Sequence, residues 1–299
     1  MVTVRRVLTK ILLLKLLINV AMKKILLILL FFIPTIVSGQ AIPYGNNPAA
    51  GDYVKVKDGT RIYYETYGTG KPLVLLHGGL YGEISEYENL IPVLSKNFMV
   101  IAIATRGHTK SEIGHQPYTY QLMSDDAYTV IRQVTKDSIT LIGFSDGAVI
   151  ALDLTIRHPD LVRKLVFAGG NISSASYRPG EMDQLKRLSG ASLERDIPDF
   201  VRERKKLMPE PERWGDFVEL LKHAWINQTA VTPEQIKSIK CPVLVAAGDR
   251  DRYNAIESFV SIYKLLPLAQ LAIIPNSDHI IFYRQPALME TMVTGFLMK

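Results

Sequence analysis

The stretch TLIGFSDGAVIA, residues 140–151, decides how this chain should fold. A β-branched apolar run leads into Gly143, Ser145 and Gly147, and small and apolar residues follow at helical spacing. This order predicts a strand, a sharp turn and a helix, with the serine hydroxyl pointing out of the sheet toward the free N–H groups of the helix. Ser145 is therefore a candidate nucleophile. Glycine-rich turns also occur as plain connections, so the motif alone does not show that Ser145 is catalytic. That depends on whether the chain also supplies a base and an acid for it.

A length of 299 residues permits one large α/β domain or two small ones, and the order of elements favours one. The formal net charge of +6 comes from residues 1–39, which hold six of the 35 basic residues and no acidic residue. The remainder therefore has 29 basic residues against 29 acidic ones. A neutral body gives no basic surface for phosphates, so we expect no nucleic-acid partner.

Residues 1–39 are predicted to be a secretory signal peptide. A positive region at residues 22–24 precedes an apolar run from Ile25 to Val37, and small residues follow. This run is short for a transmembrane helix, which needs about 20 apolar residues. We therefore expect a secreted or periplasmic protein, with residues 40–52 as a linker. The alternative is an uncleaved membrane anchor, and Met22 is a second candidate start of translation.

Strands and helices alternate over residues 53–299, which predicts an α/β fold with a mostly parallel sheet and helices on both faces. A hairpin is expected around Asp58-Gly59. The alternation breaks at about residues 171–240, a charged, proline-containing stretch with both tryptophans. Apolar residues from Trp214 to Trp225 have helical spacing, so this insertion is predicted to be a helical cap. The expected buried strands are residues 72–76, 98–104, 139–142, 164–168, 243–247 and 270–274.

A serine hydroxyl is a poor nucleophile at neutral pH, so Ser145 needs a base and a residue that orients the base. Parallel-sheet enzymes place such residues at the carboxyl ends of strands. One late strand ends in GDRD, residues 248–251, and the last one ends in PNSDH, residues 275–279. The order Ser, Asp, His is the one that accompanies a G-x-S-x-G turn. His279 is therefore the candidate base rather than a solvated loop residue.

The chain resembles the α/β-hydrolase superfamily over about residues 50–299. The motifs that carry the resemblance are HGG at 77–79, GFSDG at 143–147, GDRD at 248–251, and His279 followed by RQP at 284–286.

The resemblance implies a serine hydrolase with Ser145 as nucleophile, Asp251 as the residue that orients the base, and His279 as base. It also implies that the backbone N–H groups of Gly79 and Asp146 form the oxyanion hole, and that no cofactor or metal is needed. We expect the neighbouring acid, Asp249, to bond the turn instead.

The chain departs from the family pattern at one place. The family commonly has D-x-R-G-x-G-x-S after its fourth strand, but here Ala104 and Thr109 occupy the Asp and second Gly positions. This departure weakens an expected turn and leaves the chemistry intact.

Asp146, Trp214 and Trp225 are candidate substrate-binding residues. Residues 145–147 and 168–171 resemble the valacyclovirase-like branch, whose members hydrolyse aminoacyl esters. A carboxylate at position 146 could pair with a protonated α-amino group. The alternative is that it only favours the start of a helix.

The remaining histidines are assigned surface or structural roles, and the single cysteine a structural one. His77 is expected to hold the oxyanion loop, and Cys241 to be a buried small hydrophobe. The other histidines lack the paired spacing or acidic neighbours of a metal site; they are His108, His115, His158 and His223.

The expected function is an exported carboxylic-ester hydrolase that forms an acyl-enzyme with a small-molecule substrate. The same triad also serves amide and aminoacyl-ester hydrolysis, cofactor-free perhydrolysis and carbon–carbon bond hydrolysis. An aspartate nucleophile, as in dehalogenases and epoxide hydrolases, is argued against by Ser145. A catalytically silent binding protein of this fold is a further alternative, and the complete Ser, Asp, His set speaks against it.

Overall fold

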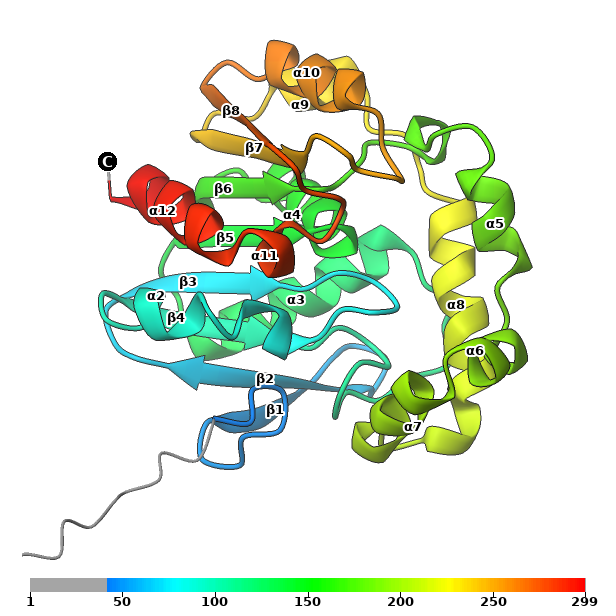
Figure 1. The fold of residues 1–299 in the computed structure, drawn as a ribbon. Helices are drawn as coiled ribbons and strands as arrows, with labels where there is room; N and C mark the ends of the chain where they lie inside the picture. Colours follow the sequence, from blue (N-terminus) through cyan, green and yellow to red (C-terminus); the bar gives the residue numbers. More distant parts are fainter. Residues whose placement is uncertain (1–41, 299) are drawn as a thin grey trace, which may run out of the picture. The chain divides into compact units, whose positions relative to one another are not determined.

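An eight-stranded sheet forms the centre of the computed structural model, which describes residues 42–298 (Figure 1). The strand order is β1-β2-β4-β3-β5-β6-β7-β8. β2 is antiparallel to both of its neighbours, and the other pairs are parallel, as predicted. The strands are β1 (Gly51–Lys55), β2 (Arg61–Tyr67), β3 (Lys71–Leu76), β4 (Phe98–Ile103), β5 (Ile139–Phe144), β6 (Val162–Ala168), β7 (Val243–Gly248) and β8 (Ala269–Ile274).

Helices cover both faces of the sheet, which explains why the central strands are continuous apolar runs. Every residue of β5 and β7 is buried. One face packs against α3 (Tyr120–Val134), α4 (Asp146–Arg157), α9 (Pro233–Lys237) and α10 (Ile256–Leu265). The other packs against η1 (Ile84–Tyr87), α2 (Ile91–Leu94), α11 (Ile281–Arg284) and α12 (Pro286–Leu297). Among residues 42–298, no helix combines the length and apolar character needed to cross a bilayer.

Residues 43–50, just before the first strand, belong to the folded body, although residues 40–52 were expected to be a linker. β1 begins at Gly51, two residues before the predicted strand. The buried carboxylate of Glu65 accepts hydrogen bonds from the N–H groups of Gly45, at 2.9 Å, and Asn47, at 2.8 Å. The hydroxyls of Tyr63 and Tyr67 also donate to this carboxylate, each at 2.8 Å, so its oxygens are well satisfied, and the two N–H bonds tie the segment to the sheet.

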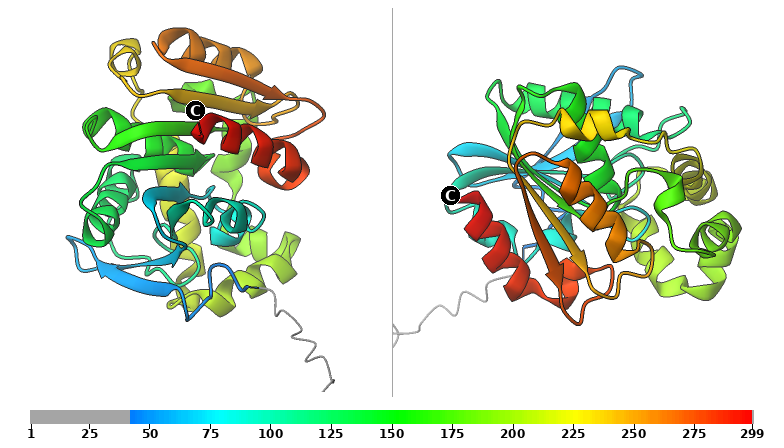
Figure 2. Two further views of the ribbon diagram at one scale, coloured as in Figure 1. Left: turned by 90° about the vertical axis from the view of Figure 1, so that its left-hand side faces the viewer. Right: turned by 90° about the horizontal axis from the view of Figure 1, so that it is seen from above.

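The insertion between β6 and β7 is helical, and most of it lies beyond the carboxyl ends of the strands (Figures 1 and 2). Its last helix, α9, instead packs against the sheet beside α10, because the buried Ile236 joins the core there. We call residues 171–232 the cap. It contains η2 (Ser174–Ser176), α5 (Glu181–Arg187), α6 (Gly190–Asp196), α7 (Pro198–Leu207), η3 (Pro211–Arg213) and α8 (Trp214–Ile226).

The turn that departs from the family pattern is formed although two of its usual residues are replaced, by Ala104 and Thr109. Thr109 replaces glycine and adopts a left-handed backbone with φ of 45°, a conformation that is strained for a β-branched residue. Ser111 compensates, since its Oγ donates to the carbonyl oxygen of Ala104 and accepts from the N–H of Tyr63, both at 2.8 Å. These two bonds hold the ends of the turn.

Candidate active site

Ser145 occupies a strained corner between β5 and α4. Its backbone has φ of 52° and ψ of −119°, and its N–H donates to the carbonyl oxygen of Ala168 at 2.8 Å. A Cβ atom at Gly143 would lie 2.3 Å from the carbonyl oxygen of Gly147, and one at Gly147 would lie 2.1 Å from that of Leu76. Only glycine fits at both positions, so the motif is explained by close backbone packing around the serine.

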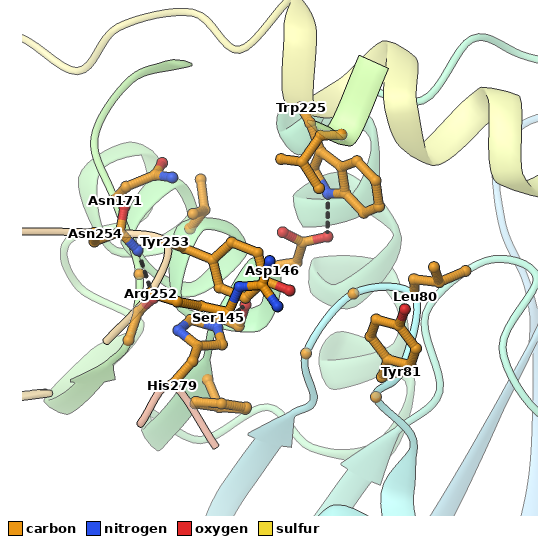
Figure 3. Close-up of a pocket in the computed structure, with 18 of the residues that line it drawn as sticks. Leu80, Tyr81, Ser145, Asp146, Asn171, Trp225, Arg252, Tyr253, Asn254 and His279 are labelled. Carbon is orange, nitrogen blue, oxygen red and sulfur yellow. Dashed lines mark hydrogen bonds between the residues drawn. The ribbon is translucent and has the colours of Figure 1, made fainter. Parts of the chain in front are cut away.

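His279 lies between Ser145 and Asp251. Its Nε2 is 2.8 Å from the Oγ of Ser145 (Figure 3). Its Nδ1 is 2.8 Å from the Oδ2 of Asp251. The other oxygen of Asp251 accepts the N–H groups of Tyr253 and Asn254, at 2.9 and 3.0 Å. The Asp251 carboxylate accepts a hydrogen bond from the Nδ1–H of His279, which keeps the proton on Nδ1 and leaves Nε2 free to take the serine proton.

The neighbouring acid, Asp249, does not contact His279. Its Oδ1 accepts the N–H of Ser277 at 3.0 Å and so bonds the loop that carries the histidine. The structure therefore gives Asp249 and Asp251 different partners, although Asp249 bonds the loop of His279 rather than its own turn, where it was expected.

The N–H groups of Gly79 and Asp146 have no acceptor among the described residues. Asp146 is the first residue of α4, so its N–H lies at the positive end of the helix dipole. Both residues line the same cavity as Ser145. Free backbone donors beside a nucleophile are suited to stabilise a developing oxyanion.

His77 holds the loop that carries Gly79. The N–H of Thr105 donates to its Nε2 at 3.1 Å, so the proton is on Nδ1, which donates to the carbonyl oxygen of Gly78 at 2.7 Å. Burial lowers the pKa of His77 well below its ordinary value, so the ring stays neutral. His108, expected in a surface or structural role, is also buried here, with Nε2 3.1 Å from the carbonyl oxygen of Gly79.

Glu86 lies behind the same loop and was not identified from the sequence. Its Oε2 accepts the N–H of Gly78 at 2.8 Å, and its side chain lines the cavity. Burial raises the pKa of Glu86 to about 8. A lone glutamate with no motif around it carries no signal in the sequence, because its role depends on packing below the loop.

A cavity of about 200 Å³ opens beside Ser145, between the strand ends and the cap. Its apolar walls include Leu80, Phe144, Val149, Leu185, Leu188 and Ile280. The side chain of Asp146 also lines it, and its two oxygens accept the hydroxyl of Tyr120 at 2.9 Å and the Nε1 of Trp225 at 2.7 Å. Burial raises the pKa of Asp146.

Trp214, expected to contact substrate, does not line this cavity. It is buried inside the cap, where its Nε1 donates to the carbonyl oxygen of Gly190 at 3.3 Å and its ring packs on Phe217. Helical spacing predicted an apolar face for α8 but could not separate the residues that face the cavity from those that fill the cap. Trp225 does line the cavity.

Within residues 42–298, no group of three or more His, Cys, Asp or Glu side chains is arranged to hold a metal ion. Cys241 is half-buried rather than buried, and burial raises the pKa of its thiol to about 11. A protonated thiol of this kind is unreactive.

Comparison with known proteins agrees with this architecture. Residues 71–208 match the model of the family described as alpha/beta hydrolase fold. The chain is 26% identical to the AB hydrolase superfamily protein YisY of Bacillus subtilis, over 82% of this chain and 98% of that protein. It is 24% identical to the 2-hydroxy-6-oxo-6-(2'-aminophenyl)hexa-2,4-dienoic acid hydrolase of Metapseudomonas resinovorans, over 80% and 88% of the two chains.

Solved structures show the same fold. The meta-cleavage product hydrolase CumD of Pseudomonas fluorescens IP01 superimposes with a TM-score of 0.68 at 20% identity, over 84% of this chain and 98% of that one. The esterase EaEST of Exiguobacterium antarcticum gives a TM-score of 0.66 at 24% identity, over 83% of this chain and all of that one. The chain belongs to the α/β-hydrolase superfamily.

Proposed function

We propose that this protein is a serine hydrolase that cleaves small carboxylic esters through an acyl-enzyme. The observation that carries the proposal is the position of His279, with one ring nitrogen 2.8 Å from the Ser145 hydroxyl and the other 2.8 Å from the Asp251 carboxylate. A catalytically inactive binding protein would not need this complete set of serine, histidine and aspartate.

In the proposed reaction, the Ser145 Oγ attacks the ester carbonyl while His279 Nε2 takes its proton. Asp251 stabilises the resulting imidazolium, and the free N–H groups of Gly79 and Asp146 stabilise the oxyanion. His279 then gives its proton to the leaving alcohol, and the acyl group remains on Ser145. A water molecule, deprotonated by the same ring, releases the acid.

The proposal predicts a covalent acyl intermediate. Rapid mixing with p-nitrophenyl acetate should give a burst of about one p-nitrophenol per protein if deacylation is the slower step, and intact-mass measurement after acid quench should give an added acetyl group. Ser145→Ala should remove both signals. Turnover with the added mass on a residue other than Ser145 would contradict the mechanism.

Carbon–carbon bond hydrolysis is a second candidate. Two relatives are named as a 2-hydroxymuconate semialdehyde hydrolase and a hydrolase of a 2-hydroxy-6-oxo-dienoic acid, and each aligns over at least 80% of this chain. A dienoate of this type absorbs strongly, so its cleavage can be followed as loss of colour. A kcat/KM for a dienoate that exceeds those of all esters tested would replace ester cleavage as the primary activity.

We also propose that the protein is exported, from the charge and apolar pattern of residues 1–39, which lie outside the described residues. The mature protein should begin near Gln40 or Ala41. N-terminal sequencing of protein recovered outside the cytoplasm tests this. A mature chain that still begins at Met1 or Met22 would contradict a cleaved leader.

A further inference from the structure

Two buried carboxamide oxygens in the cavity wall have no hydrogen-bond donor among the described residues. They are the Oδ1 atoms of Asn171 and Asn254, and these side chains are 4% and 2% exposed. Buried side-chain oxygens are normally hydrogen-bonded, because an unsatisfied acceptor loses its water without replacement. Their presence in a cavity wall points to a ligand or a displaceable water as the missing partner.

The local structure fixes the direction of the Asn254 amide. Its Nδ2 faces the carbonyl oxygen of Gly169 at 3.4 Å, and a carbonyl can only accept, so Oδ1 must be the opposite end (Figure 3). Its backbone is also held, since its N–H donates to Asp251 and it forms a β-bridge with Tyr177. Tyr177 in turn lies beside the side chain of Asn171. The two asparagines are therefore held on one wall of the cavity.

This wall lies next to the reacting groups. Asn171 and Asn254 follow the carboxyl ends of β6 and β7, which are neighbouring parallel strands. Gly169 packs against His279, and a Cβ atom there would lie 3.3 Å from its Cε1. A substrate group that reaches this wall is therefore within a few bonds of the carbonyl that Ser145 attacks.

We propose that Asn171 and Asn254 form a subsite that recognises an N–H or O–H donor on the substrate. The preferred esters carry a hydroxyl or amino group close to the ester linkage, where plain esters carry a methyl group. This inference rests on the proposed ester hydrolysis and names its substrate class. The energetic reason is that a methyl group leaves both buried oxygens unpaired, whereas a donor satisfies them.

The test uses pairs of esters that differ by a hydroxyl or ammonium in place of a methyl group, on the acyl or the alcohol part, with hydrolysis measured by pH-stat. At least one donor-bearing ester should exceed its methyl counterpart by about tenfold or more in kcat/KM. The ratio should fall toward one in Asn171→Leu and Asn254→Leu. The ammonium and hydroxyl pairs show which donor is used, since Asp146→Asn should weaken the ammonium preference alone.

Gln228 provides a matched control. Its amide oxygen is buried without a partner among the described residues, as in the two asparagines, and so is its amide nitrogen, but Gln228 does not line the cavity. Gln228→Leu should therefore leave the ratio unchanged. Asn171→Asp and Asn254→Asp keep an acceptor oxygen and should retain the preference for the ammonium pair, which guards against a leucine variant that fails to fold.

Binding separates this inference from the proposed function. Calorimetric titration of Ser145→Ala with the same ester pairs measures recognition without hydrolysis. Tighter binding of a donor-bearing ester by a wild-type enzyme that turns over no ester would support the subsite and overturn the ester reaction. The subsite would be overturned if neither hydrolysis nor binding favoured a donor-bearing ester. It would also be overturned if the preference survived in both Asn171→Leu and Asn254→Leu.

Discussion

The carboxylate of Asp251 lies 2.8 Å from Nδ1 of His279, at the end of a turn that begins only three residues earlier at Gly248. Asp249, two residues before it, bonds the N–H of Ser277 instead. Two acids in one short turn therefore have separate tasks, one toward the base and one toward the loop that carries the base.

Asp251→Asn should lose far more activity than Asp249→Asn. An amide at position 251 cannot stabilise the imidazolium and favours the wrong tautomer of His279, so we expect kcat to fall by about 10³ to 10⁴. At position 249 the amide oxygen can still accept from Ser277, and we expect less than about a tenfold change. Steady-state kinetics of both variants on one ester test this, and the reverse order would exchange the two roles.

We predict that the side chain of Asp146, which lines the cavity, favours a cationic substrate. Its oxygens already accept from Tyr120 and Trp225, but each carboxylate oxygen can accept more than one hydrogen bond. Burial raises the pKa of Asp146, which disfavours its charged form. An ammonium group bound nearby would favour the charged form again. We expect α-aminoacyl esters to be preferred by roughly 10- to 100-fold in kcat/KM over acyl esters of equal size.

Asp146→Asn should weaken this preference while plain esters remain substrates. The measurement is the ratio of kcat/KM for p-nitrophenyl esters of 2-aminobutyrate and butyrate in both proteins. A ratio near one in the wild type, or an unchanged ratio in the variant, would show that the side chain of Asp146 does not select the substrate and only favours the start of the helix.

Arg204 of the cap joins α7 to the oxyanion loop. Its guanidinium donates to the carbonyl oxygen of Tyr81 and pairs with Glu83, and its side chain is only 14% exposed. Removing it should loosen the loop that carries Gly79, so we expect Arg204→Ala to lower kcat by about tenfold.

Arg202, on the same helix, is the matched control. It is exposed, and among residues 42–298 it pairs only with Asp199 and Glu203 of its own helix, so Arg202→Ala should change kcat by less than about twofold. Affinity for a boronic acid, which forms a tetrahedral adduct with the serine, should fall in parallel with kcat in the Arg204 variant. Equal kinetics in the two variants would refute a link between the cap and the oxyanion loop.

Glu86 should make stability depend on pH. Because burial raises its pKa to about 8, the folded protein keeps this proton while an unfolded chain loses it near pH 4.5. The folded state therefore binds more protons between these values, and stability falls as pH rises from about 4.5 to about 8. Glu86→Gln lacks this loss and keeps an acceptor for the N–H of Gly78.

The melting temperature of Glu86→Gln relative to the wild type should therefore rise across this window and level off above it. The full effect is on the order of 2 to 4 kcal/mol, or several degrees. Calorimetric scans of both proteins at intervals from pH 5 to 9 give this difference. A difference that stays constant from pH 5 to 9 would show that the pKa of Glu86 is not raised in the folded protein.

The sequence is informative about this site where function requires a local backbone geometry. Ser145 is visible because close packing restricts its neighbours to glycine, and His279 because it follows the last strand in the required order. The alternation of apolar strands and helices also predicted the mostly parallel sheet, because helices must cover both faces of such a sheet.

The remaining features depend on contacts between distant segments. Glu86, Arg204 and the asparagine pair have no motif, because their surroundings arise only when the cap and the strand ends come together. Trp214 was misplaced because spacing along one helix does not reveal what packs against each side. Glu65 likewise gave no sign that its carboxylate would bind the preceding segment.

The central claim is that Ser145 is the nucleophile. Its most direct test is labelling of the folded protein with a fluorophosphonate probe, followed by peptide mapping, in the wild type and in Ser145→Ala. The account predicts stoichiometric labelling on Ser145 alone, and none in the variant, whose melting temperature should stay close to that of the wild type. Labelling that persists in Ser145→Ala, or a wild-type protein that hydrolyses esters without reacting with the probe, would contradict it.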